Sequence, residues 1–238
     1  MYMLAPLSEH YDDGFGAIGD AFRNAAQTLR KTNGGDGRAS LDDLPEIYLL
    51  RHAVELFLKS GIVIMHRRMK LRYDSEPHSS ATPLMRTSSG KWKPLLNTHD
   101  ILGLYEYWKA LIDGNRDKLI KLMPHTTDLD VPTELDDWIR RLGTADPNSD
   151  YFRYPISKNP AADKAKSPFK EVAPQSLFAT ASKEYVKALV LENAKGEVVK
   201  TFKYDKATSK ALTEAARAAA EMLSNFHFMM RVELAGGW

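Results

Sequence analysis

The chain has 238 residues, of which 43% are hydrophobic and 27% charged, so it is long and apolar enough to bury a core rather than stay disordered throughout. Its 33 Lys and Arg residues nearly balance 31 Asp and Glu residues, and the net charge of +2 gives no argument from total charge for nucleic-acid binding. The chain contains no cysteine, which excludes disulfides, thiolate zinc sites and a cysteine nucleophile.

Membrane and secreted proteins are also disfavoured. No apolar run approaches the roughly 18 residues that a helix needs to span a bilayer. The first residues, MYMLAPLSEHYDD, lack a basic segment followed by an apolar one, so they do not predict a signal peptide. We therefore expect a soluble cytoplasmic protein without a membrane partner.

The first predicted helix covers residues 8–32, where apolar side chains recur at intervals of three and four. Gly14, Gly16 and Gly19 each lower the helix propensity by about 1 kcal/mol relative to Ala, or they allow another helix to approach closely. The sequence NGGDG at 33–37 is expected to end this helix, because glycines suit a left-handed cap.

The central prediction is a buried helix over residues 45–70, since its helical projection is apolar on most sides. One narrow polar stripe interrupts the apolar surface. Arg51 precedes Glu55 by four residues, and Glu55 precedes Lys59 by four, so their charges can neutralise one another in partial burial. The polar residues of this helix are Arg51, His52, Glu55, Lys59 and, further along, His66.

Residues 71–97 are predicted to form a loop excursion, because they contain three prolines and a stretch rich in Ser and Thr. The loop is also basic and carries an aromatic residue, Trp92. Such a loop can follow a phosphate backbone and stack a base, or it is an ordinary solvated surface loop. Both interpretations stay open.

Further helices are predicted after this loop. An amphipathic helix should start near 98, capped by Asn97 or Thr98, and end at Asp113–Gly114. A further turn or two is expected at 116–123, and a short helix should run from Pro132 to Gly143. The segment 146–155 is irregular, and the chain from there to about 176 should be mostly loop.

The last third of the chain combines a hairpin and a helix. Residues 186–204 predict a β-hairpin, because two β-favouring runs flank an Asn-Ala-Lys-Gly turn. The final helix is predicted over 206–233. We thus expect a mainly α fold in a single helical domain, 1–238, with a loop and β-hairpin insertion at 156–205 before the last helix.

Three segments together resemble bacterial proteins with HEPN-like domains. YLLRHAVELFLKSGI at 48–62 carries the pattern RHxxExxLK, HDILGLYEYW at 99–108 has an HDL-like helix start, and DPNSDYFRYP at 146–155 matches DPxSxxFRYP. The resemblance spans roughly residues 45–155. It implies an up-and-down helical bundle that forms a homodimer and works in prokaryotic antiviral defence or toxin-antitoxin systems. In some branches of the family, RNA cleavage or nucleotide binding is implied as well.

The ribonuclease branch of this family typically carries an Arg followed four to six residues later by a His at the start of a late helix. In the last predicted helix, Arg217 and His227 are too far apart, and His227 precedes Arg231 in the reverse order. Arg72 and His78 have the right spacing, but they lie in the predicted loop and Pro77 intervenes. This departure argues against a metal-independent ribonuclease.

The polar stripe is the candidate site. As a working site, His52 would exchange protons, Arg51 would hold a phosphate and Glu55 would orient the pair. As a structural network, the same residues would fix the register of the bundle. Under that alternative the charges need matched partners. The candidate partners are Arg153, expected near Glu55, and His99, expected beside Arg51 or Glu55. For a working site, the candidate substrate-binding residues are Lys59, His99, Arg153 and Tyr154.

The sequence contains no motif for a metal site or for a serine nucleophile. The histidines lack the H-x-x-x-H and H-E-x-x-H spacings of metal ligands, so no metal site is expected. No cofactor is expected either. No Gly-x-Ser-x-Gly nucleophile elbow occurs. Two functions stay open: an HEPN-like protein that binds RNA or a nucleotide and cleaves RNA as a dimer, or a non-catalytic helical module that binds a protein partner and in which the stripe is purely structural.

Overall fold

The computed structural model describes residues 5–33, 43–73, 83–126, 129–154, 156, 160–181, 187–205 and 207–237. The predicted mainly α fold is confirmed. The helices are α1 (Phe15–Asn33), α2 (Asp43–Met69), α3 (Ile101–Gly114), α4 (Arg116–Leu122), α5 (Thr133–Ala145), α6 (Pro160–Lys166), α7 (Pro174–Ala181) and α8 (Ala207–Ala235), after a short 3-10 helix at Leu7–Glu9. The strands are β1 (Leu84–Arg86), β2 (Trp92–Pro94), β3 (Phe169–Val172), β4 (Ala188–Glu192) and β5 (Val198–Tyr204).

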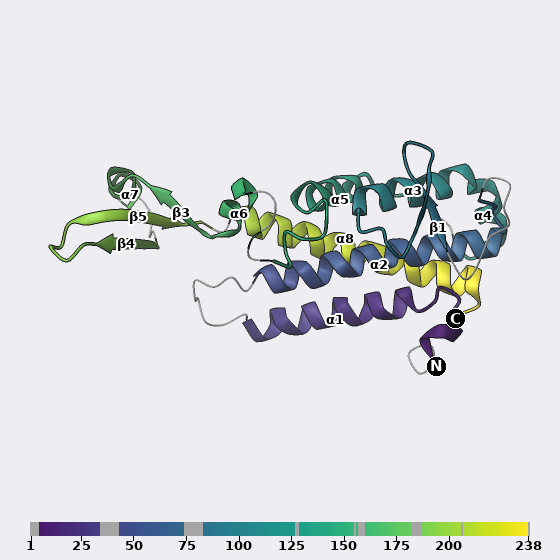
Figure 1. Cartoon of the computed structure of the whole chain (residues 1–238). Coiled ribbons are helices and arrows are strands. Elements are labelled where there is room, and N and C mark those ends of the chain that lie inside the picture. The colour runs from purple at the N-terminus through teal and green to yellow at the C-terminus, as the bar shows by residue number, and fades with distance from the viewer. Residues whose placement is uncertain are drawn as a thin grey trace.

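The long helix α2 is the centre of an elongated bundle. It packs against α1, α3 and α8, and α5 packs against both α3 and α8. Figure 1 shows α1, α2 and α8 side by side along the long axis of the molecule. Every residue from Ala53 to His66 is buried, as expected for a helix that is apolar on most sides. The predicted central helix is confirmed.

The first helix begins at Phe15 rather than at residue 8. The backbone prevents an earlier start, because Asp13 (φ 58°) and Gly14 (φ 80°) occupy the left-handed region. The Asp12 carboxylate then accepts hydrogen bonds from the backbone N–H groups of Gly14 (3.0 Å) and Gly16 (2.7 Å). Asp12 thereby satisfies donors that would otherwise lack partners at the start of the helix.

Two glycines of α1 let other elements approach closely, as one of the two interpretations predicted. A Cβ added at Gly16 would lie 2.0 Å from the His227 imidazole, and one added at Gly19 would lie 2.9 Å from the Phe57 ring. Both distances are too short for a side chain to be accommodated without movement. Because they lack side chains, these glycines allow α1 to pack closely against α8 and α2.

The excursion at 71–97 contains an element that was not predicted, an antiparallel ribbon of β1 and β2. Trp92 on this ribbon contacts the rings of Tyr73 (5.0 Å between centroids), Tyr107 (6.1 Å) and His66 (6.4 Å). The ring that could have stacked a base is therefore half-buried against other aromatic rings. Residues 74–82, which include Pro77 and His78, lie outside the described part of the chain.

The boundaries of α3 and α5 also differ from the prediction. Asp100, rather than Asn97 or Thr98, is the N-cap of α3, and its carboxylate accepts from the N–H groups two and three residues further on. Helix α5 continues through Gly143 instead of ending there. Gly143 lies inside the helix at a close contact, because a Cβ added there would lie 2.4 Å from the Leu102 side chain.

The elements β3, α7, β4 and β5 form an arm that projects beyond the end of the bundle (Figure 1). The predicted hairpin is confirmed as β4 and β5, with Gly196 in its turn at φ 77°. The predicted loop before it is wrong, since α6, β3 and α7 form there and β3 pairs with β5 in the order β3-β5-β4. The prolines explain the error: Pro160 and Pro174 are the first residues of helices, where the missing N–H is harmless.

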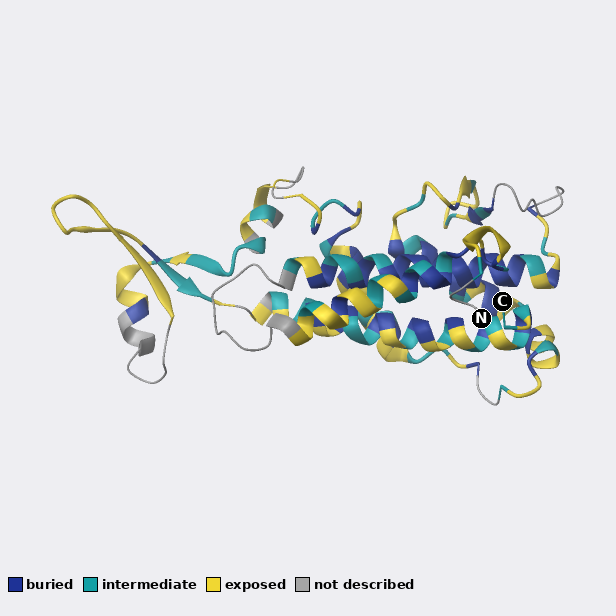
Figure 2. Ribbon diagram, turned by 90° about the horizontal axis from the view of Figure 1, so that it is seen from below, coloured by how far each residue is buried: buried dark blue, intermediate teal, exposed yellow. Residues whose placement is uncertain are grey.

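Burial divides the molecule into two parts. In Figure 2 the interior of the bundle is dark blue, whereas the arm is mostly yellow and teal. The buried hydrophobic cluster lies wholly in the bundle and its connections. Across the described ranges, no helix combines the length and the apolar character needed to cross a membrane.

Candidate functional site

The polar stripe of α2 is a buried ion-pair network. The side chains of Arg51 and Glu55 have 0% exposed surface, and Arg51 Nη1 lies 2.9 Å from Glu55 Oε2. Lys59 Nζ lies 2.8 Å from Glu55 Oε1. The pairs predicted from the four-residue spacing therefore form, with one carboxylate between two cations.

Two other segments complete the network. Asp146, which follows α5, places Oδ2 2.8 Å from Arg51 Nε, although without hydrogen-bond geometry at that nitrogen. Arg51 Nη2 donates to the carbonyl oxygen of His99 (2.6 Å), just before α3. His99 Nδ1 lies 3.0 Å from Glu55 Oε1, which confirms the predicted position of His99. The stripe thus ties α2 to the start of α3 and the end of α5.

The charges of this network are balanced. Arg51 and Lys59 face Glu55 and Asp146. Burial alone would raise the pKa of Glu55, but the combined effect of Lys59, Arg51 and a hydrogen bond from His99 lowers it. Glu55 is therefore ionised at neutral pH and neutralises the cations beside it.

The third motif enters the network through Asp146. Its Oδ2 faces Arg51, while its Oδ1 accepts from the backbone N–H groups of Asp150 (2.8 Å) and Tyr151 (2.9 Å). One carboxylate thereby holds the irregular turn of DPNSDYFRYP and connects it to α2. The three segments that carry the HEPN-like resemblance meet at this cluster.

His52 lies apart from that network. Its ring packs edge-on against Phe22 (4.5 Å between centroids) and parallel to Tyr48 (6.2 Å). Burial lowers the pKa of His52, so the imidazole is neutral at pH 7. Among the described residues, no hydrogen bond joins His52 to Arg51 or Glu55. The three proposed catalytic residues therefore do not form one hydrogen-bonded unit.

Arg153 and Tyr154 form an exposed pair of their own. The guanidinium of Arg153 lies 5.2 Å from the centroid of the Tyr154 ring and donates to the Tyr154 hydroxyl (3.0 Å). The prediction that Arg153 is a partner of Glu55 is wrong, because Asp146 is the residue that the third motif contributes to the network. The final residue of that motif, Pro155, lies outside the described residues.

A second buried polar cluster was not predicted from the sequence. Ser60 Oγ donates to Asp12 Oδ2 (2.5 Å) and lies 2.9 Å from His227 Nδ1, which must then donate to it. Burial lowers the pKa of His227. In a Ser-His-Asp triad the carboxylate orients the imidazole, whereas here it binds the serine. All three side chains are buried, so this cluster joins α8 and the start of α1 to α2.

The sequence signals for this second cluster are weak. A single serine stands within the apolar half of α2, and Gly16 leaves room for an imidazole. The partners lie far apart in the sequence. Only the packing of three helices brings them together.

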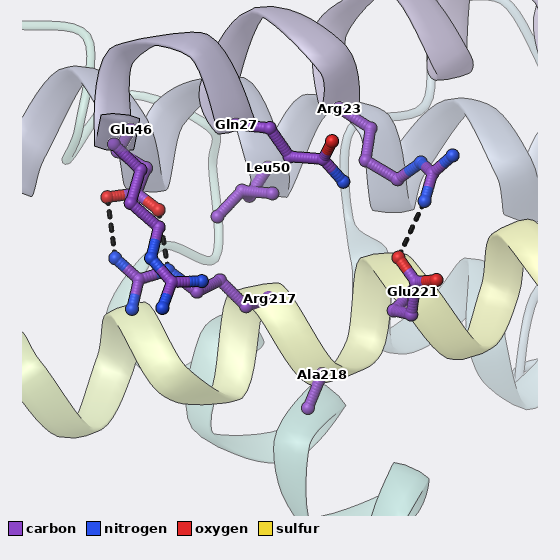
Figure 3. Close-up of a pocket in the computed structure, with 8 residues that line it drawn as sticks. Arg23, Gln27, Glu46, Leu50, Arg217, Ala218 and Glu221 are labelled. Carbon is purple, nitrogen blue, oxygen red and sulfur yellow. Dashed lines mark hydrogen bonds and ion pairs between the residues drawn. The ribbon is translucent and has the colours of Figure 1, made fainter. Parts of the chain in front are cut away.

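An arginine-lined pocket of about 300 Å³ lies between α1, α2 and α8 (Figure 3). Arg217 makes two hydrogen bonds to Glu46 (2.6 and 2.7 Å), and Arg23 donates to Glu221 (2.6 Å). Sequence reasoning did not find it because three helices supply its walls. The lining residues are Arg23, Gln27, Arg30, Glu46, Leu50, Arg217, Ala218 and Glu221.

Within the described ranges, no group of three or more His, Asp or Glu side chains is placed to hold a metal ion. No family model matches the sequence, and neither a curated protein nor a solved structure matches the chain. The HEPN-like resemblance therefore rests on the three motifs alone.

Proposed function

We propose that this protein is a non-catalytic, HEPN-like helical interaction module. Its buried polar stripe holds the bundle together, and its arm binds a protein partner. The observation that carries the proposal is the complete burial of Arg51 and Glu55, both with 0% exposed side chain and both paired with opposite charges. The lack of cysteine and the motif resemblance support a cytoplasmic role in a prokaryotic defence or toxin-antitoxin system.

The chemistry of the stripe supports this choice over RNA cleavage. A general base must come within hydrogen-bond reach of the proton that it removes, and His52 is packed against Phe22 instead. A phosphate could bind Arg51 only by displacing carboxylates from a buried site. That exchange would leave displaced charges without partners, which is costly in an apolar interior.

The arm supports the binding of a protein. It exposes apolar side chains on β4 and β5, including Leu189, Leu191 and Val199. Concentrated exposed apolar surface, in contrast to single scattered residues, is typical of interaction sites. In the bundle, by comparison, the large apolar residues of α2 are covered by neighbouring helices.

The catalytic alternative is tested by incubating RNA with the wild type and with His52→Ala. We expect intact RNA in both samples. Cleavage by the wild type that is lost in His52→Ala would contradict the proposal, provided that melting curves show both proteins folded. An exposed histidine variant, His125→Ala, serves as the matched control for nuclease contamination, because it should carry over the same trace activity.

A second candidate function, nucleotide binding, is favoured by the arginine-lined pocket. Arginine suits phosphate because its guanidinium donates two parallel hydrogen bonds. Arg30 lines the pocket with an exposed side chain, and among the described residues it forms no ion pair. A nucleotide phosphate could bind Arg30 without disturbing the Arg217–Glu46 and Arg23–Glu221 pairs.

Titration calorimetry with ATP tests this candidate. We expect Arg30→Ala to weaken binding, while Arg68→Ala, which removes an exposed arginine elsewhere on α2, should leave the affinity unchanged. Equal affinity in all three proteins, or no binding to the wild type, would exclude the pocket as a nucleotide site.

A further inference from the structure

One edge of the three-stranded sheet in the arm is formed by β4, an exposed and apolar strand. Among the described strands, β4 has only β5 as a neighbour, and all residues of β4 are exposed (Figure 2). Leu189, Val190 and Leu191 keep 45%, 45% and 43% of their surface exposed. Edge strands are commonly protected from pairing by lysine or proline. The strand ALVLE contains neither residue, and its register shift lies at its very end, between Leu191 and Glu192.

The hydrogen bonds of the hairpin show which backbone groups of β4 point outward. The Tyr204 N–H donates to the carbonyl of Lys187 (2.9 Å), and these two residues face each other in the register of the hairpin. In antiparallel strands, hydrogen-bonded pairs alternate with pairs that are not hydrogen-bonded. Leu189 and Leu191 therefore also direct their backbone groups toward β5. The outward-directed residues are Ala188, Val190 and Glu192.

We propose that β4 pairs with β4 of a second copy of the chain. The two strands run antiparallel about a two-fold axis at Val190, so that both arms join in one continuous sheet. Strand addition at an exposed sheet edge is a recurring mode of protein recognition. This inference rests on the proposed function of the arm as a binding surface, and it names the partner.

The backbone restricts the possible registers, because paired residues must both direct their groups outward. With the axis at Val190, Val190 lies opposite itself and Ala188 lies opposite Glu192. Leu189 then lies opposite Leu191, and Lys187 lies opposite Asn193. Apolar side chains meet on both faces, and no two like charges are opposed.

A neighbouring register is less favourable. With Leu189 on the axis, Lys187 would lie opposite the apolar Leu191. With Val190 on the axis, Lys187 lies opposite the polar Asn193 and the two leucines lie opposite each other. A two-fold interface places residues of one strand opposite residues of its copy, and β4 can do this without opposing like charges, which supports a second copy as the occupant.

The first test is the mass of the full-length protein, measured by sedimentation over a wide range of concentration. We expect a dimer for the wild type. Val190→Lys should raise the dissociation constant at least roughly tenfold, because it places like charges directly opposite each other. Val190→Glu should do the same, and an equimolar mixture of the two variants should recover the dimer.

The control for this series is Val232→Lys, since Val232 on α8 is 44% exposed and lies outside the arm. It should leave the mass unchanged. A monomeric wild type would overturn the inference. A dimer that Val190→Lys and Val190→Glu do not weaken would overturn it equally, because the copies would then meet elsewhere.

Cross-linking tests the register. The chain has no cysteine, so Val190→Cys introduces a single thiol. Hydrogen-bonded residues opposite each other in antiparallel strands have Cα atoms about 5.5 Å apart, within the range of about 4.4–6.8 Å for a disulfide. Mild oxidation should give a covalent dimer. Val199→Cys, on β5 of the same sheet, is the control, and equal cross-linking of both variants would contradict the register.

The outcomes separate this inference from the proposed function. If the protein is a monomer and leaves RNA intact, pairing with a second copy is excluded, and the arm remains a surface for a different protein. RNA cleavage that depends on His52 overturns the non-catalytic function, whatever the mass of the protein.

Discussion

The bundle buries charged side chains, whereas the arm exposes a continuous run of apolar side chains on one strand. In the bundle, the charged groups of Arg51 and Glu55 are fully buried and paired. In the arm, Leu189 and Val190 remain exposed on an edge strand. Buried charges must be matched within the molecule. Exposed apolar residues on an edge strand can instead be matched by another chain.

This contrast shows why motif residues need not mark a working surface. The residues of the RHxxExxLK segment are polar, regularly spaced and suited to acid–base chemistry, yet the structure places Arg51 and Glu55 in the interior. The arm carries no motif of the resemblance. We infer that the interior network is structural and that the arm is the binding surface.

The largest effect is expected when one charge of the buried ion-pair network is removed. Glu55→Ala should lower the free energy of unfolding by about 3–5 kcal/mol, because it leaves Arg51 and Lys59 buried without their shared partner. Urea denaturation measures this loss. Glu106→Ala, which removes an exposed carboxylate from α3, should change the stability by no more than about 0.5 kcal/mol. Equal stability of the two variants would contradict the structural role.

The close approach of α1 and α8 is tested at a glycine. Gly16→Ala should cost about 1–3 kcal/mol by overpacking, because its Cβ would lie 2.0 Å from the His227 imidazole. Gly114 is the matched position, since a Cβ added there would meet no heavy atom of the described residues within 4 Å, and Gly114→Ala should be neutral or slightly stabilising. Thermal melting of both variants decides the matter, and a Gly16→Ala protein as stable as the wild type would disprove the close contact.

A smaller effect should appear in the pH dependence of stability. The pKa values of His52 and His227 lie below their ordinary value of 6.5 in the folded protein. As the pH falls below 6.5, the unfolded chain therefore binds protons that the folded protein does not, and the stability decreases. His52→Phe keeps the ring packing and should reduce this slope. An unchanged slope would show that His52 titrates normally.

The smallest effect is expected in the arm. Val190→Lys should change the melting of the monomeric bundle by no more than about 0.5 kcal/mol, because Val190 is exposed and lies outside the buried cluster. The measurement is made at a protein concentration below that of dimer formation. A large loss of bundle stability would show that the arm is part of the core rather than a separate surface.

Much of the fold follows from local patterns in the sequence. The helical period and apolar character predict α2 and α8, and the Asn-Ala-Lys-Gly turn between β-favouring runs predicts the hairpin of β4 and β5. The ion pairs of Arg51, Glu55 and Lys59 follow from their spacing of four residues. Each of these features depends on residues that are close together in the chain.

The features that were missed depend on contacts between distant residues. Asp146 contacts Arg51, which lies 95 residues earlier in the chain. No local pattern indicates that Asp146, rather than Arg153, joins the buried network. Ser60 and His227 are separated by 167 residues. Strand β3 was missed because its partner β5 lies on the far side of α7 in the sequence. Local periodicity carries no information on these pairings.

Amide hydrogen exchange on the full-length protein tests the central claim most directly, because it reports on α2 and β4 together. We predict that the amides from Arg51 to Lys59 exchange only through global unfolding, and that the Val190 N–H becomes protected as the protein concentration rises, while the Leu189 N–H is protected at every concentration. Rapid local exchange around Glu55, together with a Val190 N–H that stays unprotected at the highest concentration, would contradict the account.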